Sequence, residues 1–240
     1  TTERARRYRA LVLPNQACLS DDQCDALRRF VRNGGGVVAT FETSRFTEKA
    51  ERRGDFALGD LFGVKALTDA SHGPYDRSYV RLEEHEVLGA GLEGTNAVAG
   101  TVPLYICPVG VASDARIHLT FIPPVPNMPP ERTFYHVPRT DTALAVSRTE
   151  GKGRVVYFPC DIDRWCWARN NPDHRTILEN AVRWVLNGAL LIEVAGSGLV
   201  DVFVYRKGAR IIIHLVNCTN PDNWTPPATE ITPIGPLKVT

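Results

Sequence analysis

Two short stretches of the chain concentrate carboxylate, guanidinium and indole side chains, which are groups that bind ligands or anchor protein contacts. Each stretch follows an apolar run, one beginning at Val37 and the other at Val155. Aromatic and arginine side chains are enriched at interfaces, and a few convergent polar groups suit a small-molecule pocket. We therefore predict a ligand- or interface-facing crevice formed by Glu42, Arg45, Asp161, Asp163, Arg164, Trp165 and Trp167.

The carboxylates in this set do not form a recognised catalytic pair. Glycoside hydrolysis needs two carboxyl groups that flank the scissile bond, whereas Asp161 and Asp163 lie two residues apart on one predicted loop. Their other possible roles are capping of backbone N–H groups and pairing with Arg164, and core packing is the alternative for the two tryptophans. Asp161, Asp163 and His174 lack a recognisable ligand spacing, so the sequence predicts no metal site and no cofactor.

The elements that would position these residues begin with a strand–helix–strand unit. Ala10–Leu13 is a short apolar run typical of a strand buried on both faces, and Val37–Ala39 is a second. Between them Ser20 and Gln23 match a capping box, which predicts a helix start. Two strands joined through a helix pair in parallel. Because ligand-facing groups lie at the carboxyl ends of such strands, residues 41–46 are placed at the crevice.

Gly73 and Pro74 predict a loop at residues 71–75, and Pro103 and Pro108 within residues 98–111 predict irregular or edge strands there. The next elements are a strand, a stiff loop, a hairpin and a helix. A strand over Ile117–Ile122 runs into residues 123–130, where five prolines predict an extended loop. This loop is either a spacer or a rigid wall of a cleft or subunit contact. Residues 143–158 are typical of a β-hairpin, residues 159–167 of a polar and aromatic loop, and Asn171 caps a further helix.

The hydrophobic pattern changes near residue 190. Alternation in Val200–Tyr205 and an apolar run in Ile211–Val216 predict an antiparallel hairpin, the start of a β-sandwich. We therefore place a boundary near Gly188. Residues 1–188 are expected to form an α/β domain with a mostly parallel sheet and helices on both faces, and residues 189–240 a partial C-terminal β domain.

The amino-acid composition restricts the kinds of partner that the chain is expected to bind. Lys and Arg number 28 against 27 Asp and Glu, a formal net charge of +1, which argues against a nucleic-acid or membrane-surface partner. The six cysteines form no C-x-x-C pair, and their scatter favours reduced, buried thiols and a cytoplasmic location. The chain opens almost directly on a buried strand and closes on a strand-like run, so we expect it to be a piece of a larger protein.

Four segments carry a resemblance to a known family: residues 11–15, 34–40, 153–158 and 180–184. They look like the class I glutamine amidotransferase-like domain. More closely, they resemble its version in β-galactosidases of glycoside hydrolase family forty-two, called the trimerisation domain. The resemblance covers about Tyr8 to Gly188 and implies a flavodoxin- or amidotransferase-like sheet. In that family a catalytic TIM barrel lies N-terminal and a β-sandwich lies C-terminal.

A working amidotransferase would need a nucleophilic Cys at about Phe41–Thr43, and a His and a Glu at about Pro159–Asp161. No Cys lies between Val37 and Phe46, and no His lies between Val155 and Asp163. Cys160 as a displaced nucleophile is the weaker reading, because a small buried residue fits that place better. We therefore expect this part of the chain not to be catalytic alone.

The resemblance thus implies an assembly and active-site-shaping domain of a β-galactosidase-like glycoside hydrolase. Its partners would be the TIM barrel of the parent protein and further copies of the same chain. Two alternatives stay open. One is a carbohydrate-binding or ligand-sensing module, and the other is a hydrolase with an unrecognised site at Glu42, Asp161 and Asp163.

Overall fold

The computed structural model describes residues 7–100, 102–169, 171–188, 190–219 and 232–240. The chain falls into two compact units, residues 1–188 and residues 189–240. Within the described residues no helix combines the length and the apolar character that crossing a membrane requires.

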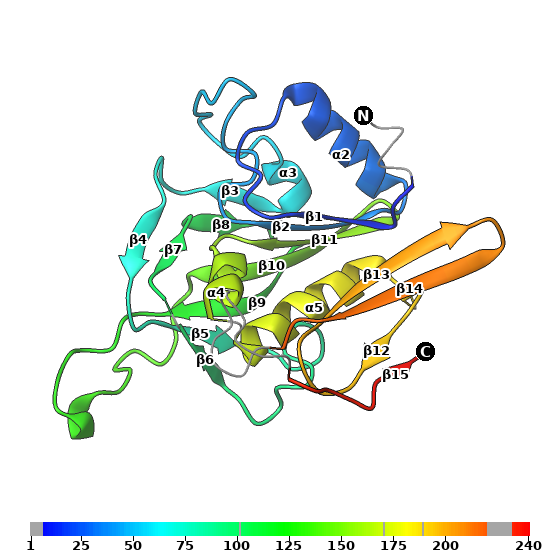
Figure 1. Ribbon diagram of the computed structural model, residues 1–240. Coiled ribbons are helices and arrows are strands. Elements are labelled where there is room, and N and C mark those ends of the chain that lie inside the picture. Colours follow the sequence, from blue (N-terminus) through cyan, green and yellow to red (C-terminus); the bar gives the residue numbers. More distant parts are fainter. Residues whose placement is uncertain (1–6, 101, 170, 189, 220–231) are drawn as a thin grey trace. The chain divides into compact units, whose positions relative to one another are not determined.

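A seven-stranded sheet forms the centre of the first unit (Figure 1). Its strands, in spatial order, are β1 Ala10–Leu13, β2 Gly36–Thr40, β11 Gly153–Phe158, β10 Ala143–Glu150, β9 Arg116–Ile122, β5 Tyr79–Leu82 and β6 Ala97–Ala99. β1 and β11 pair in parallel with β2. The predicted α/β class and the placement of these three strands in one sheet are therefore confirmed. The parallel arrangement is concentrated there, because the β11–β10, β10–β9, β9–β5 and β5–β6 pairs are antiparallel.

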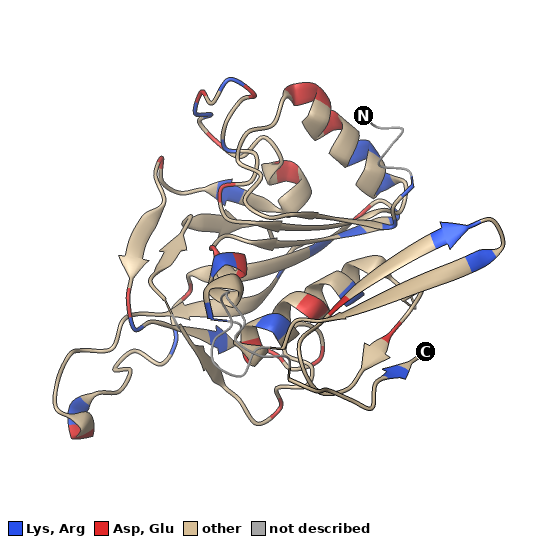
Figure 2. Cartoon of the chain, in the orientation of Figure 1, with Lys and Arg blue, Asp and Glu red and all other residues tan. Residues whose placement is uncertain are grey.

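Helix α2, Asp21–Arg32, begins at the predicted capping box. The Gln23 N–H donates to Ser20 Oγ at 3.2 Å, and the Ser20 N–H donates to Gln23 Oε1 at 2.9 Å. Acidic side chains open the helix and basic side chains close it, as Figure 2 shows, which complements the helix dipole. The helix buries one apolar face: Cys24, Leu27, Phe30 and Val31.

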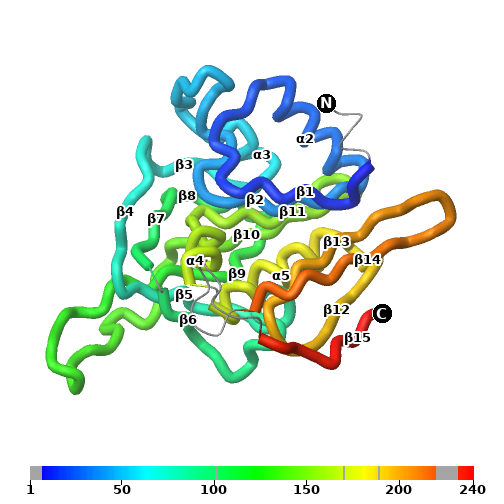
Figure 3. Tube along the Cα trace, in the orientation of Figure 1, coloured from blue at the N-terminus to red at the C-terminus, as the bar shows by residue number. Residues whose placement is uncertain are grey.

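Helices cover both faces of the sheet (Figure 1). α2 and the short α3, Gly59–Phe62, pack on the face that carries Val37 and Tyr157. α4, Ile162–Arg169, and α5, Pro172–Leu186, pack on the face that carries Val38 and Val156. Successive residues of β2 and β11 thus enter opposite cores, which is why these strands are apolar throughout. Figure 3 lets the reader follow how β1, β2 and the distant β11 come to lie side by side.

Two small antiparallel sheets complete this unit. β3, Val64–Ala66, pairs with β8, Val109–Val111, and β4, His72–Tyr75, pairs with β7, Leu104–Ile106. The short β6, β7 and β8 confirm the predicted irregular strands between residues 98 and 111. The loop predicted at residues 71–75 is instead β4. Its backbone pairs with β7 at His72 and Tyr75, and a register irregularity between these pairs accommodates Gly73 and Pro74.

The segment after β11 also differs from the prediction. Residues 159–167 were expected to form a loop, but α4 starts at Ile162. The Trp165 N–H donates to the Asp161 carbonyl at 3.2 Å, closing the first helical turn. Ile162 and Trp165, three residues apart, both enter the core, so tertiary packing explains the helix.

The described part of the second unit contains two two-stranded antiparallel sheets. β13, Val200–Lys207, pairs antiparallel with β14, Arg210–Asn217, as the alternation predicted. β12, Val194–Ala195, pairs antiparallel with β15, Lys238–Val239.

Candidate functional site

A pocket of about 340 Å³ lies where the three parallel strands end. Asn15 follows β1, Phe41 follows β2 and Asp161 follows β11, so each strand delivers one side chain to it. Its lining residues are Asn15, Phe41, Ser71, Tyr105, Asp161, Asp163 and Arg164. This is the edge where an open parallel sheet presents ligand-facing groups.

Two of the lining residues have a left-handed backbone. Asn15 has a φ of 44° and Phe41 a φ of 50°. An aromatic residue in this region is strained by roughly 1–2 kcal/mol. The Phe41 N–H donates to the Phe158 carbonyl at 2.7 Å, and the Phe41 carbonyl accepts a hydrogen bond from the hydroxyl of Tyr157. The neighbouring strand β11 therefore holds the strained turn in place.

Asp161 is buried and fully engaged. Its Oδ1 accepts from the Tyr105 N–H at 2.9 Å, and its Oδ2 accepts from Arg164 Nε at 2.6 Å. Burial raises the pKa of this carboxyl group, and the two hydrogen bonds only partly offset it. Arg164 also donates to the Pro103 carbonyl and lies 5.5 Å from the centre of the Tyr105 ring. Asp161 and Arg164 thus hold the pocket wall together.

Asp163 is different because one of its carboxylate oxygens has no partner. Its Oδ1 is buried and accepts no hydrogen bond from any described residue. Asp163 also lines the pocket. A buried acceptor left without a donor costs about 1–3 kcal/mol, so Asp163 is a lining residue whose hydrogen bonds the described residues do not complete.

Arg45 and Trp165 were predicted to face the crevice, but the structure buries both side chains. Trp165 is 0% exposed and packs in the core, its ring 5.0 Å from that of His174. Arg45 is 2% exposed and donates to the carbonyls of Thr68 and Asp69 at 3.2 Å and 3.1 Å. Both side chains are enclosed by the protein, and neither lines the pocket.

Glu42 and Trp167 lie outside the pocket lining as well. Glu42 faces Arg52, with 3.6 Å between Glu42 Oε1 and Arg52 Nη2. Trp167 is on the outer side of α4 and is 72% exposed. Of the seven predicted residues, the structure gathers Asp161, Asp163 and Arg164 in the pocket and leaves Trp167 on the surface.

The cysteine chemistry does not support a nucleophile at this edge. Cys160 is fully buried, its Sγ lies 3.5 Å from the Leu144 carbonyl, and burial raises the pKa of its thiol well above the usual value. Burial likewise raises the pKa of Cys107 to about 12. All six cysteines are free thiols. No group of three or more His, Cys, Asp or Glu side chains among the described residues could hold a metal ion.

A carboxylate–imidazole–hydroxyl array, which the sequence did not predict, lies elsewhere in the first unit. His118 Nδ1 is 2.8 Å from Glu84 Oε1, and His118 Nε2 is 2.7 Å from Ser147 Oγ. This order of groups matches that of a nucleophilic triad. Ser147 is only 5% exposed, however, so its hydroxyl is closed to a substrate. The array instead ties together β9, β10 and the segment after β5.

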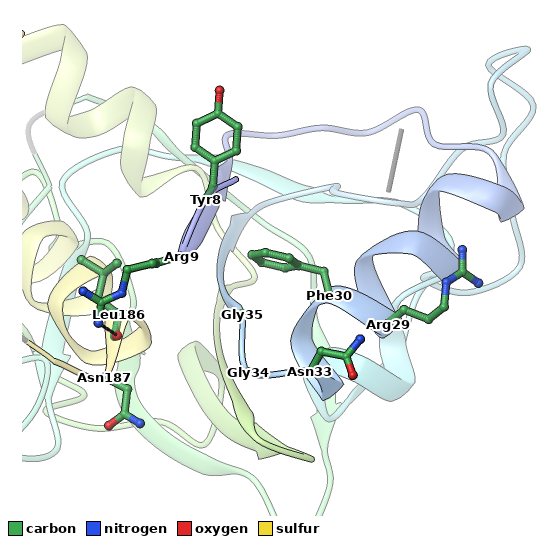
Figure 4. Close-up of a pocket in the computed structure, with 9 residues that line it drawn as sticks. All are labelled: Tyr8, Arg9, Arg29, Phe30, Asn33, Gly34, Gly35, Leu186 and Asn187. Carbon is green, nitrogen blue, oxygen red and sulfur yellow. Dashed lines mark hydrogen bonds between the residues drawn. The ribbon is translucent and has the colours of Figure 1, made fainter. Parts of the chain in front are cut away.

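A second pocket, of about 510 Å³, lies at the opposite, amino ends of β1 and β2 (Figure 4). It is bordered by the last turns of α2 and α5 and by Tyr8. Arg9 Nη2 donates to the Leu186 carbonyl at 3.2 Å across one wall, while Arg29 points away from the other drawn side chains. The pocket is lined by Tyr8, Arg9, Arg29, Phe30, Asn33, Gly34, Gly35, Leu186 and Asn187, which include no carboxylate or thiol.

Comparison with known proteins gives a likeness of fold. No protein-family model matches the sequence, and no curated protein does. Among solved structures, the GH42 β-galactosidase Gan42B of G. stearothermophilus matches 90% of this chain and 27% of its own, at 20% identity and a TM-score of 0.61. The β-galactosidase of Bacillus circulans sp. alkalophilus matches 89% of this chain and 27% of its own, at 14% identity and a TM-score of 0.64.

An α-L-fucosidase isoenzyme of Paenibacillus thiaminolyticus matches 97% of this chain and 34% of its own, at 16% identity and a TM-score of 0.66. The chain thus spans about a quarter to a third of the length of these structures. At such identities the likeness shows the fold alone. The amidotransferase-like fold stays a prediction from the sequence.

Proposed function

We propose that this chain is a non-catalytic assembly and active-site-shaping domain of a larger, β-galactosidase-like glycoside hydrolase. The observation that carries the proposal is the pattern of coverage. About nine-tenths of this chain matches about a quarter of the β-galactosidase chains. A part of that size has the dimensions of an accessory domain, and its partner would be the TIM barrel of the parent protein.

The chemistry of the strand ends supports a non-catalytic role. A glycosidase needs two carboxyl groups on opposite sides of a scissile bond. Here Asp161 is neutralised by Arg164, and Asp163 lies on the same helix-entry segment. Neither arrangement brackets a bond, and the buried Cys160 is no substitute nucleophile.

Exposed apolar side chains supply the surface for assembly. Trp167 projects from α4, and the proline-rich loop is followed by the 3₁₀ turn Pro130–Arg132 and further exposed rings. The large side chains exposed on and after that loop are Met128, Phe134, Tyr135 and Val137. Aromatic anchors of this kind dominate the energetics of protein contacts. We propose that these residues meet the TIM barrel or a neighbouring copy, as in a trimer.

We expect the isolated chain to hydrolyse neither glutamine nor an aryl galactoside, because it holds neither a Cys–His–Glu set nor a flanking carboxylate pair. Release of ammonia from glutamine and of the phenol from the galactoside would be measured on the purified chain. A Cys160→Ala variant serves as the check. Glutamine turnover that disappears in that variant would contradict the non-catalytic assignment.

Trp167→Ala, made in the parent protein, is expected to weaken assembly or activity while leaving the domain folded. Truncation of a buried tryptophan anchor typically costs an interface about 2 kcal/mol or more, a rise of roughly thirtyfold in the dissociation constant. Analytical ultracentrifugation and turnover of an aryl glycoside would measure the two effects. Arg169→Ala, an exposed change on the same helix, is the matched control. Unchanged assembly and activity in Trp167→Ala would exclude α4 as a contact.

A further inference from the structure

The pocket at the strand ends contains polar groups that the protein itself leaves unused. Asp163 Oδ1 is buried without a donor. Within the described part of the chain, the side chains of Asn15 and Ser71 make no hydrogen bond either, although both line the pocket. The Asp163 carboxylate accepts hydrogen bonds, whereas the Asn15 amide and the Ser71 hydroxyl can both donate and accept them. This combination suits a polyhydroxylated ligand.

An aromatic surface lies next to these groups. The rings of Phe41 and Tyr105 are 6.4 Å apart, and Arg164 covers the Tyr105 ring. Phe41 is thus the lining ring to which we assign the ligand contact. The C–H face of a sugar ring packs on such a face while its hydroxyl groups turn to the polar side. This combination of one apolar wall and a few placed polar groups is typical of small-molecule sites.

The charge and size of the pocket further restrict the class of ligand that it can bind. Asp161 pairs with Arg164, so Asp163 leaves the lining with an excess negative charge, which disfavours phosphates and carboxylates. A volume of about 340 Å³ is near the lower end of the range of about 300–1,000 Å³ for ligand pockets, so it holds one ring and not an oligosaccharide.

We propose that this pocket binds a single neutral sugar residue, with Phe41 against the ring and Asp163 accepting from its hydroxyl groups. Strained backbone is commonly retained where it serves a binding site, and Asn15 and Phe41 both carry it here. The inference goes beyond the proposed assembly role and does not depend on it, since the isolated chain contains every residue of the pocket.

Titration of the purified chain with D-glucose, D-galactose and D-mannose, followed by NMR chemical shifts, tests the proposal. We expect saturable binding of at least one sugar, and a loss of about tenfold or more in affinity in Asp163→Ala, the effect of removing about 1.4 kcal/mol of binding free energy. Phe41→Gly is expected to lose binding as strongly while staying folded, because glycine adopts a φ of 50° without strain. Arg169→Ala, outside the pocket, should bind like the unaltered chain.

Two further probes separate the ligand classes. Inorganic phosphate and D-glucosamine would be titrated in the same way. No shift of pocket residues with any neutral sugar, or undiminished binding in both pocket variants, would overturn the proposal. Tighter binding of phosphate or of the cationic amino sugar than of all three neutral sugars would also overturn it, since the ligand class would then be charged. These measurements do not involve assembly, so their outcome is distinct from that of the proposed domain function.

Discussion

Trp165→Ala is expected to lower the unfolding free energy of the first unit by about 3–5 kcal/mol, the usual cost of removing a fully buried aromatic side chain. Trp165 is 0% exposed and joins α4 to the core formed by β5, β6 and α5. A Cβ placed on Gly100 would lie 2.6 Å from its ring, which shows how closely the chain packs there. The neighbouring groups cannot close a hole of this size without moving the sheet edge.

Urea unfolding followed by circular dichroism would measure the loss. Trp167→Ala is the matched control, since it removes the same side chain from the same helix at a position that is 72% exposed. We expect that variant to change stability by no more than about 0.5 kcal/mol. Similar stability losses in the two variants would show that Trp165 is not the anchor of this core.

Glu84→Ala is expected to cost about 3 kcal/mol, because one carboxylate serves four donors. Its oxygens accept from the N–H groups of Glu86, Val87 and Leu88 and from His118. Removing this acceptor leaves its donors unsatisfied, and a buried donor without a partner costs about 1–3 kcal/mol. Glu86→Ala is the control, since that side chain is 80% exposed and faces Arg116 at 3.6 Å. Equal urea midpoints for the two variants would contradict the structural role of the network.

The same network gives the stability a defined dependence on pH. Burial alone would raise the pKa of Glu84, but the hydrogen bonds from Val87, His118, Leu88 and Glu86 together lower it to about 2. Its contribution is therefore present above its ordinary pKa of about 4.5 and is lost as the pH falls towards 2. Glu84→Ala should flatten this part of the stability curve, and urea midpoints across the range would show it.

His118 also makes the folded state less stable as the pH falls, but in a higher pH range than Glu84. Burial lowers its pKa below 6.5, with a further contribution from Arg116 and an opposing one from Glu84. The unfolded chain therefore binds a proton before the folded chain does, and stability declines as the pH falls below about 6.5. His174, also buried, has a lowered pKa for the same main reason and adds to this decline.

The parts of the fold that the sequence predicted are those decided locally. The capping box at Ser20 and the two-sided apolar strands β1, β2 and β11 carry their signals within a few residues. The loop predictions for residues 71–75 and 159–167 were wrong, because contacts with distant parts of the chain decide the structure of both segments. β7 pairs with the first, and the core encloses Trp165 in the second. Neither partner can be identified from nearby residue types.

The candidate site shows the same difference between features decided locally and features decided by distant contacts. Asp161, Asp163 and Arg164 follow β11 and line the pocket, and a position after a strand can be read from the local sequence. Whether an Arg or a Trp at such an end is enclosed depends on the packing around it, and Arg45 and Trp165 proved to be enclosed. Residues 41–46 were predicted to lie at this edge, but Phe41 was not singled out, because a left-handed backbone at an aromatic residue has no sequence signature. An Asn just past the end of a strand, as at residue 15, is a signal that could have been used, because Asn adopts the left-handed conformation more readily than most residues.

The turn at Phe41 has a consequence for protein engineering. A sharp, strained turn at the end of a strand is the geometry in which hydrolases expose a nucleophile. Here Tyr157 and the backbone of Phe158 already stabilise that backbone around a side chain with no reactive atom. A designer adding acyl-transfer chemistry to this scaffold would replace Phe41 with Ser or Cys. The remaining task would be to supply a general base from Ser71 or Tyr105 positions across the pocket.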